Sequence, residues 1–320
     1  MGKDNPFISV VLSFFNEEEN IPELVRRLRA TLGKEFPERY ELVFVNDAST
    51  DRSLELLKEL AQGHKDIKVL NMSRNFGVEA CMMAGMGATK GDAVVYLDAD
   101  LQDPPELIPT LVQAWQKDPE VEVAYTTRLS RAGEHPLKLW LTNVGYKTLK
   151  ACSNIEVVPN AGDYRLLSRR VVNELLRLSE KKPYFRGLVT WIGFKQVPVQ
   201  YHRDARYAGD TKRPVYSFSV INYFLDSALI SFSDVPLKIA LLLGFVVSLG
   251  AFLWLVGVVI MKLLHLAVPG WAAMMVTVLM LGGVQLLTIG VLGLYINAIY
   301  RETRHRPHYI VKDTLGFDEK

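Results

Sequence analysis

The chain contains the stretch Ala93-Val94-Val95-Tyr96-Leu97-Asp98-Ala99-Asp100-Leu101-Gln102-Asp103, an apolar run that ends in an acidic cluster. The apolar run predicts a buried strand. Asp98, Asp100 and Gln102 alternate along the end of that strand, and closely spaced oxygen ligands suit Mg²⁺ or Mn²⁺ bound to substrate phosphates. The stretch therefore predicts a divalent cation site on a diphosphate. The alternative is an acidic turn in front of a helix that Pro104-Pro105 would start.

Strands and helices alternate at short spacing around this stretch. The apolar patterns predict strands at residues 7–14, 40–47, 67–72 and 93–97 and helices at residues 21–32, 54–60 and 78–88. This alternation predicts an α/β fold with a mostly parallel sheet covered on both faces. Further along, the patterns predict helices at residues 106–115 and 137–151 and strands at residues 121–126, 163–167 and 194–202.

Polar residues also follow the first two predicted strands. Asn16-Glu17-Glu18 comes after the first strand and Asn46-Asp47 ends the second. Ligands of open α/β sheets bind at the carboxyl ends of the strands, so these residues and Asp98 should meet at one binding site. Asp47 is suited to accept hydrogen bonds from a nucleobase or a ribose, and the alternative role is the N-cap of the next helix.

The overall charge argues against nucleic acid as a partner. The 37 basic and 35 acidic residues nearly balance, so the chain lacks a strong basic footprint. Cys81 and Cys152 have no metal-type spacing, and a reduced cytosolic setting fits them better than a disulfide.

The last third of the chain contains two uncharged apolar runs of membrane length, at residues 239–261 and 267–300. The first run would span about 34 Å as a helix, enough to cross the hydrocarbon core. The short connector predicts a two-helix transmembrane hairpin, and the alternative is a pair of buried core helices in a soluble protein. Residues 215–235 mix aromatic with polar side chains, which indicates an amphipathic helix at the membrane surface.

Basic residues crowd the side of the hairpin that carries both chain ends, so both termini should be cytoplasmic. The expected organisation is a catalytic domain at residues 1–213, interfacial helices at 214–236, two transmembrane helices at 237–300 and a cytoplasmic basic tail at 301–320. Glycine pairs in the second run, Gly282-Gly283 and Gly290 with Gly293, predict close helix packing.

Several motifs together resemble those of a known enzyme family. They are Ser13-Phe14-Phe15-Asn16-Glu17-Glu18, Val45-Asn46-Asp47-Ala48-Ser49, Ser73-Arg74-Asn75-Phe76-Gly77, Asp98-Ala99-Asp100-Leu101-Gln102-Asp103-Pro104-Pro105, Gly162-Asp163-Tyr164-Arg165-Leu166, Gly209-Asp210-Thr211-Lys212, Leu281-Gly282-Gly283-Val284-Gln285 and Arg306-Pro307-His308-Tyr309. With them the chain resembles family 2 glycosyltransferases of the Rossmann-like GT-A fold. Within that family it is similar to the polyprenyl-phosphate glycosyltransferases, such as bactoprenol glucosyltransferases and dolichol-phosphate mannose synthases.

The resemblance implies roles for individual residues. It implies donor nucleotide binding by Phe14, Asn16, Glu17, Asp47, Ser73 and Asp98, metal binding by Asp98, Asp100 and Gln102, catalytic roles for Asp163, Asp100 and Arg128, and acceptor phosphate binding by Arg131, Arg203, Arg206 and Lys212. The basic stretch around Arg203 could equally be attracted to anionic headgroups. Two positions depart from the family pattern, since Val78 stands where a lysine is usual and Leu294 where a glutamate is usual.

The chemistry of the acceptor bears on the role of Asp163. A sugar hydroxyl needs a base to take its proton, whereas a phosphate is already largely ionised near neutral pH. Asp163 therefore need not be a general base. Because Arg165 follows it closely, we expect Asp163 to orient a basic residue or the metal and to shape the placement of the acceptor.

The resemblance predicts an inverting, metal-dependent transfer of sugar from a nucleotide-sugar, with UDP-glucose favoured, to undecaprenyl or another polyprenyl phosphate. It further implies a homotetramer in the bacterial inner membrane that serves cell-envelope glycan modification, as of lipopolysaccharide O-antigen. The alternatives are another donor (UDP-4-formamido-arabinose, a UDP-N-acetylhexosamine or GDP-mannose) and a non-catalytic membrane scaffold that binds nucleotide. A processive polymerase is less well supported, because the chain contains no Gln-x-x-Arg-Trp stretch.

Overall fold

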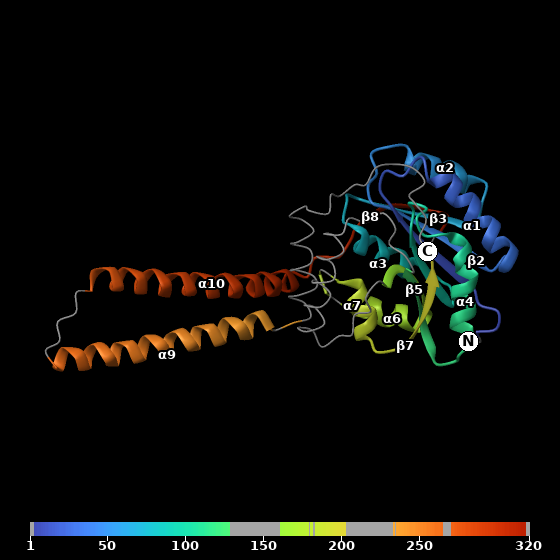
Figure 1. Cartoon of the computed structure of the whole chain (residues 1–320). Helices are drawn as coiled ribbons and strands as arrows, with labels where there is room; N and C mark the ends of the chain where they lie inside the picture. Colours follow the sequence, from blue (N-terminus) through green and yellow to red (C-terminus); the bar gives the residue numbers. More distant parts are fainter. Residues whose placement is uncertain are drawn as a thin grey trace. The chain divides into compact units, whose positions relative to one another are not determined.

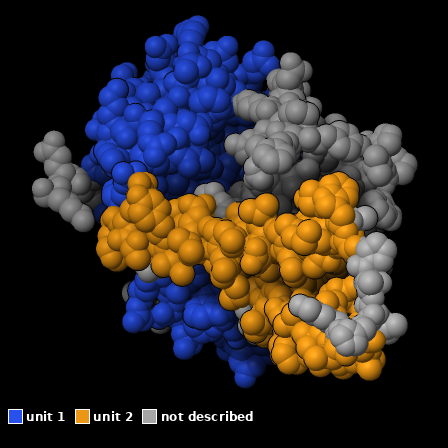
Figure 2. All heavy atoms as spheres, turned by 90° about the vertical axis from the view of Figure 1, so that its left-hand side faces the viewer, with its two compact units in different colours: residues 1–146, 155–217, 306–320 blue, residues 147–154, 218–305 orange. Residues whose placement is uncertain are grey.

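The structure is a computed structural model that describes residues 3–128, 161–178, 180–181, 183–202, 233, 235–264 and 270–317. The chain divides into two compact units, coloured separately in Figure 2. The first unit comprises residues 1–146, 155–217 and 306–320, and the second comprises residues 147–154 and 218–305. The predicted helix at residues 137–151 and the predicted interfacial helix at 215–235 lie largely or wholly outside the described residues.

In the described part of the first unit, eight strands form one sheet in the order β7-β5-β6-β4-β1-β2-β3-β8. The strands are β1 (Ile8–Phe14), β2 (Tyr40–Asn46), β3 (Ile67–Met72), β4 (Ala93–Asp98), β5 (Val121–Arg128), β6 (Ala161–Ser168), β7 (Lys195–Tyr201) and β8 (Val311–Leu315). The β4-β1-β2-β3 pairs and the β5-β7 pair are parallel, while β6 and β8 pair antiparallel with their neighbours. The carboxyl ends of β4, β1 and β2 therefore lie next to one another.

Helices cover both faces of the parallel strands, as predicted. They are α1 (Ile21–Glu35), α2 (Ser53–Gln62), α3 (Val78–Ala88), the 3₁₀ turn η1 (Pro105–Leu107), α4 (Ile108–Gln116), α6 (Arg169–Arg177) and α7 (Phe185–Trp191). Alternate residues of β1, such as Val10 and Leu12, share one core with apolar residues of α1 and α4. Burial on both faces explains why this strand is a continuous apolar run.

The other face of β1 and β2 contacts α3, and Gly85 permits that contact. A Cβ atom at Gly85 would come within 2.3 Å of Val11 Cγ1 and 3.1 Å of Val45 Cγ2. The absence of a side chain thus lets the helix approach the sheet closely. This approach fixes α3, whose first residue Val78 lines the pocket described below.

The predicted elements of the first unit are confirmed to within a few residues where the structure describes them. One difference is that the helix predicted at 106–115 begins as a 3₁₀ turn before α4. Three elements were not predicted: α6, α7 and the C-terminal strand β8. The last of these shows that the C-terminal tail adds a strand to the edge of the sheet at β3.

The second unit contains two long helices, α9 (Val235–Leu263) and α10 (Trp271–Thr303), that run side by side (Figure 1). Residues 235–261 and 273–303 are long and apolar enough to cross a membrane, and at most 6% of the most apolar window of each is buried. The alternative of buried core helices therefore does not hold. A Cβ at Gly282, Gly283, Gly290 or Gly293 would meet no described atom within 4 Å, so these glycines make no close contact with α9 within this chain, and packing against a second copy stays a prediction.

Candidate active site

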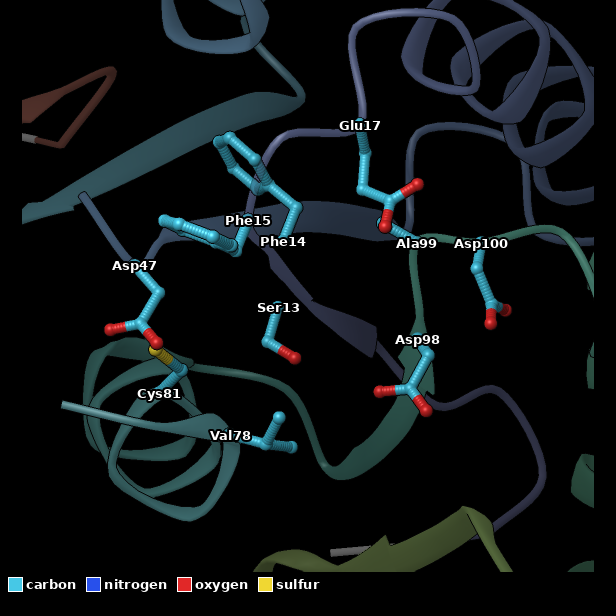
Figure 3. A pocket seen from close by; sticks show the side chains of 10 residues that line it. All are labelled: Ser13, Phe14, Phe15, Glu17, Asp47, Val78, Cys81, Asp98, Ala99 and Asp100. Carbon is cyan, nitrogen blue, oxygen red and sulfur yellow. The ribbon is translucent and has the colours of Figure 1, made fainter. Parts of the chain in front are cut away.

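A pocket opens at the carboxyl ends of β1, β2 and β4, the place that the sequence predicted for ligand binding. The pocket has a volume of about 180 Å³. The lining residues are Ser13, Phe14, Phe15, Glu17, Asp47, Val78, Cys81, Asp98, Ala99 and Asp100 (Figure 3). Figure 3 shows the carboxylate of Asp47 on one side of the pocket and those of Asp98 and Asp100 on the other.

Asp98 is held by a hydrogen bond that the sequence analysis missed. The buried hydroxyl of Tyr96 donates to Asp98 Oδ1 at 2.7 Å and lies 2.7 Å from Ser13 Oγ. Burial raises the pKa of Tyr96 well above its ordinary value, which keeps its proton available for this bond. Residues two apart in a strand point to the same face, so the sequence could have indicated that Tyr96 lies beside Asp98.

The electrostatics around Asp98 suit a bound cation. Desolvation, reinforced by the negative charges of Asp100 and Asp163, raises the pKa of Asp98 to about 7. A carboxylate pKa raised in this way reflects burial first and nearby negative charges second, and such perturbed groups are common at functional sites. A divalent cation between Asp98 and Asp100 would relieve this repulsion.

The ligand set for that cation is small. Among the described residues, no group of three or more His, Cys, Asp or Glu side chains is arranged to hold a metal ion. Asp98 and Asp100 line the pocket, whereas Gln102 does not, and its backbone N–H donates to Asp100 Oδ1 at 3.2 Å. Two carboxylates fit a Mg²⁺ or Mn²⁺ ion that takes its remaining ligands from substrate phosphates and water.

The shifted pKa of Asp98 predicts a pH-dependent stability in the absence of metal. Because the folded-state pKa is raised from 3.8 to about 7, ionisation of Asp98 destabilises the fold increasingly as the pH rises between those values. In EDTA, Asp98→Asn should therefore raise the Tm by a few degrees at pH 8 and by clearly less at pH 5. Thermal unfolding of both proteins at the two pH values is the measurement. An equal Tm difference at both pH values would contradict the raised pKa of Asp98.

Asp47 is fixed by the loop between β3 and α3. Its two carboxylate oxygens accept the backbone N–H groups of Phe76 at 2.7 Å and Gly77 at 3.0 Å. Gly77 has a φ of 98°, which glycine adopts at no steric cost. Asp47 is not the N-cap of α2, whose N-cap position is Arg52, so that alternative is wrong. A carboxylate has about four lone-pair positions, which leaves Asp47 able to accept from a ligand as well.

The loops after β1 and β2 are tied together by Asn16. The Asn16 N–H donates to Ser49 Oγ at 3.0 Å, and Asn16 Oδ1 accepts the Thr50 N–H at 2.8 Å. Glu17, which lines the pocket, is anchored through its N–H to Ser53 Oγ at 2.8 Å. Of the residues predicted to bind the donor, Phe14, Glu17, Asp47 and Asp98 line the pocket, while Asn16 supports the loop beside it.

Asp163 on β6 is paired with a residue that the sequence analysis did not identify. Arg186 on α7 donates from Nε at 2.7 Å and from Nη2 at 2.6 Å to the two oxygens of Asp163. Arg165 does not take this role, since its guanidinium is buried, donates to the Gly162 carbonyl and lies over the Phe185 ring. Asp163 does act on the pocket electrostatically, because its charge contributes to the raised pKa of Asp98.

Comparison with known proteins assigns the chain to a family. The model described as "Glycosyl transferase family 2" matches residues 9–176, more than half of the chain and all of the pocket. The chain belongs to glycosyl transferase family 2. This family membership makes the protein a glycosyltransferase, and the first unit has the GT-A type of α/β fold.

Relatives of this glycosyltransferase match over nearly its whole length. The Bacillus subtilis (strain 168) glycosyltransferase YkcC is 40% identical over 98% of this chain and 95% of its own length. A prophage bactoprenol glucosyl transferase homolog of Escherichia coli (strain K12) is 37% identical over 95% of this chain and 98% of its own. Glucosyl-3-phosphoglycerate synthase from Mycobacterium tuberculosis, solved with Mg²⁺ and UDP, is 21% identical over 71% of this chain and 80% of its own, with a TM-score of 0.45.

The remaining predicted site residues of this family 2 enzyme lie apart from the pocket or outside the described structure. The Ser73 N–H donates to the Ile310 carbonyl at 2.9 Å, and Ser73 does not line the pocket. Arg128 is the last residue of β5, and its side chain is not described. Four predicted phosphate-binding residues lie outside the described residues: Arg131, Arg203, Arg206 and Lys212.

Proposed function

We propose that this glycosyltransferase transfers a sugar from a nucleoside-diphosphate donor to a polyprenyl phosphate held in a membrane. The observation that carries the proposal is similarity to bactoprenol glucosyl transferases over 95% of a chain that also has two helices of membrane length. Relatives that match both the catalytic part and the apolar helices support a lipid acceptor more strongly than a match to the catalytic part alone.

The pocket suits a nucleotide-sugar donor. Asp47 would accept from the nucleobase or ribose at one side, and Asp98 with Asp100 would hold Mg²⁺ or Mn²⁺ on the diphosphate at the other. When bound, the metal supplies neutralisation of the negative charge that grows on the departing nucleoside diphosphate. The names of the relatives favour a glucosyl donor, and we propose that it is UDP-glucose. UDP-4-formamido-arabinose, a UDP-N-acetylhexosamine and GDP-mannose are the other donors to test.

The acceptor phosphate requires positioning more than activation. One ionised oxygen attacks the anomeric carbon from the face opposite the diphosphate, the bond to the diphosphate breaks, and the configuration inverts. No proton has to be removed, because the phosphate is already largely ionised near pH 7. We propose that Asp163 holds the guanidinium of Arg186 in place for an anionic group of the substrates. Arg128, Arg131, Arg203, Arg206 and Lys212 remain proposed phosphate contacts.

The topology supports placing both chain ends on one side of the membrane. The strand β1 precedes α9 and the strand β8 follows α10, yet both belong to one sheet. The chain must therefore cross the membrane an even number of times, as two transmembrane helices do. Basic residues flank the helices on this side at Lys238, Arg301 and Arg304, which favours the cytoplasmic face of a bacterial inner membrane. We further propose a homotetramer.

A direct assay separates this proposal from a non-catalytic scaffold. Purified protein in detergent is given radiolabelled UDP-glucose and undecaprenyl phosphate, with Mg²⁺, with Mn²⁺ or with EDTA. The expected result is labelled lipid in the presence of either metal and at least about 10²-fold less with EDTA. Parallel reactions with the alternative donors identify the sugar. If none of the donors labels the lipid while UDP still binds, the scaffold function is favoured.

A further inference from the structure

The C-terminal strand β8 lies against the strand that leads into the pocket loops. It pairs antiparallel with β3, with Asn71 opposite Asp313 and Met72 opposite Val311. The register shifts between Asn71 and Met72, at the end of β3. Just beyond, the Ile310 carbonyl accepts the N–H of Ser73, the first residue of the loop whose Phe76 and Gly77 amides bind Asp47.

Side-chain hydrogen bonds continue from β8 across two neighbouring strands. Asn71 Nδ2 donates to Asp313 Oδ2 at 2.7 Å, and Asn71 Oδ1 accepts Asn46 Nδ2 at 2.9 Å. Asn46 Oδ1 in turn accepts the Ser49 N–H at 3.0 Å. Asn46 and Asn71 are 1% and 6% exposed, so each of these polar groups needs its protein partner.

The carboxylate of Asp313 fixes which group donates and which accepts in each of these hydrogen bonds, from Asn71 through Asn46 to the Ser49 N–H. An ionised carboxylate only accepts, so Asn71 must turn its amide nitrogen toward Asp313 and its oxygen toward Asn46. Asn46 must then donate to Asn71 and present its own oxygen to the Ser49 N–H. A buried amide network with one obligatory orientation is more rigid than one that can flip.

This chain of side-chain hydrogen bonds ends at the loops that form the pocket. Ser49 lies two residues after Asp47, and its Oγ accepts the N–H of Asn16 at 3.0 Å. Asp47 itself is held from its other side by the amides of Phe76 and Gly77. The C-terminal tail thus supports Asp47 by two routes. One is the chain of side-chain hydrogen bonds from Asp313, and the other is the hydrogen bond from the Ser73 N–H to the Ile310 carbonyl.

We propose that Asp313 is a positioning residue for the half of the pocket that contains Asp47, acting through Asn71 and Asn46 on the loop at Ser49. The inference rests on the proposed function only in taking a nucleoside diphosphate as the ligand of that half. Asp313 touches no reacting group, so its removal should weaken nucleotide binding and leave turnover at saturating donor nearly unchanged.

A second contact of Asp313 offers the competing explanation. Lys58 Nζ lies 3.7 Å from Asp313 Oδ1, and both side chains are 44% exposed. Such a surface ion pair contributes little to stability and carries no link to the pocket. Lys58→Ala removes this pair and leaves the bond to Asn71 intact, so it is the matched control.

The test compares Asp313→Ala, Asp313→Asn and Lys58→Ala in the full-length protein. UDP binding is measured by titration calorimetry, and donor KM and kcat by sugar transfer. Loss of a partner for a buried amide predicts about tenfold weaker UDP binding and a similar rise in donor KM for Asp313→Ala. Asp313→Asn keeps an acceptor oxygen and should stay within about threefold of the original protein, and Lys58→Ala should bind UDP normally.

Hydrogen exchange separates failure of this inference from failure of the proposed function. Backbone amides of residues 46–50 should exchange faster in Asp313→Ala than in Lys58→Ala, whichever nucleotide the protein uses. Unchanged exchange in Asp313→Ala, or an equal effect of Lys58→Ala on exchange and on UDP binding, would overturn the positioning role. Faster exchange without UDP binding to the original protein would leave the positioning role intact and refute the UDP donor. If Asp313→Ala does not fold, Asp313→Thr serves the same test, because threonine suits a strand and lacks the carboxylate.

Discussion

Asp100→Asn is expected to lower kcat/KM for sugar transfer by about 10³-fold, because a carboxylate that holds the metal on the diphosphate loses its charge. Asp100 lines the pocket beside Asp98, and its oxygen accepts the N–H of Gln102. An asparagine at this position can still accept that hydrogen bond, so the turn after β4 should keep its conformation. The loss should therefore be chemical and not a consequence of unfolding.

The measurement is initial-rate transfer at several Mg²⁺ concentrations, together with the Tm. The matched control is Glu106→Gln, which removes a nearby acidic charge that is paired with Arg27 at the surface and lies outside the pocket. Glu106→Gln should retain at least about half of the activity, since surface pairs of this kind contribute little. An Asp100→Asn protein with more than about a tenth of normal activity at all Mg²⁺ concentrations would refute the metal-binding role.

The parts of the fold that were predictable are those whose side chains are buried on both faces. The strands β1 and β4 are continuous apolar runs because helices cover both sides of them, and this signal needs no tertiary information. The acidic residues at the ends of β2 and β4 could also be predicted, since Asp47, Asp98 and Asp100 follow apolar runs directly. The pocket brings these three residues together as predicted.

The elements that were missed owe their structure to partners far away in the sequence. The strand β8 reads Val311-Lys312-Asp313-Thr314-Leu315, and its Lys, Asp and Thr are exposed, so it resembles a polar tail until β3 pairs with it. The Asp163–Arg186 pair joins a strand to a helix 23 positions later, and no local pattern indicates it. By contrast, Asn46, the last residue of β2, is paired with Asn71, the second-last residue of β3, a pattern that could have suggested their contact.

Asp163→Asn is expected to lower kcat by about 10²-fold while UDP binding stays within about threefold of normal. The two oxygens of Asp163 hold both donor nitrogens of Arg186, and both side chains are about one-third exposed. Asparagine offers one oxygen and turns an amide NH₂ group toward the guanidinium, so the bidentate contact breaks and Arg186 loses its fixed orientation. The control is Glu174→Gln, which breaks a comparable but more exposed pair with Arg177.

Two further readouts distinguish positioning of Arg186 from general-base catalysis by Asp163. If Asp163 acts through Arg186, then Arg186→Gln should cost about as much activity as Asp163→Asn, and the double variant little more than either. A general base would instead make the two losses unequal and nearly additive.

The second readout is the pH profile. The charge of Asp163 helps to raise the pKa of Asp98, so its removal should lower that pKa. The acidic limb of the activity profile should then move to lower pH in Asp163→Asn and stay in place in Glu174→Gln. Near-normal turnover of Asp163→Asn with an unmoved acidic limb would remove Asp163 from the mechanism, because neither its contact with Arg186 nor its charge near Asp98 would then affect the reaction.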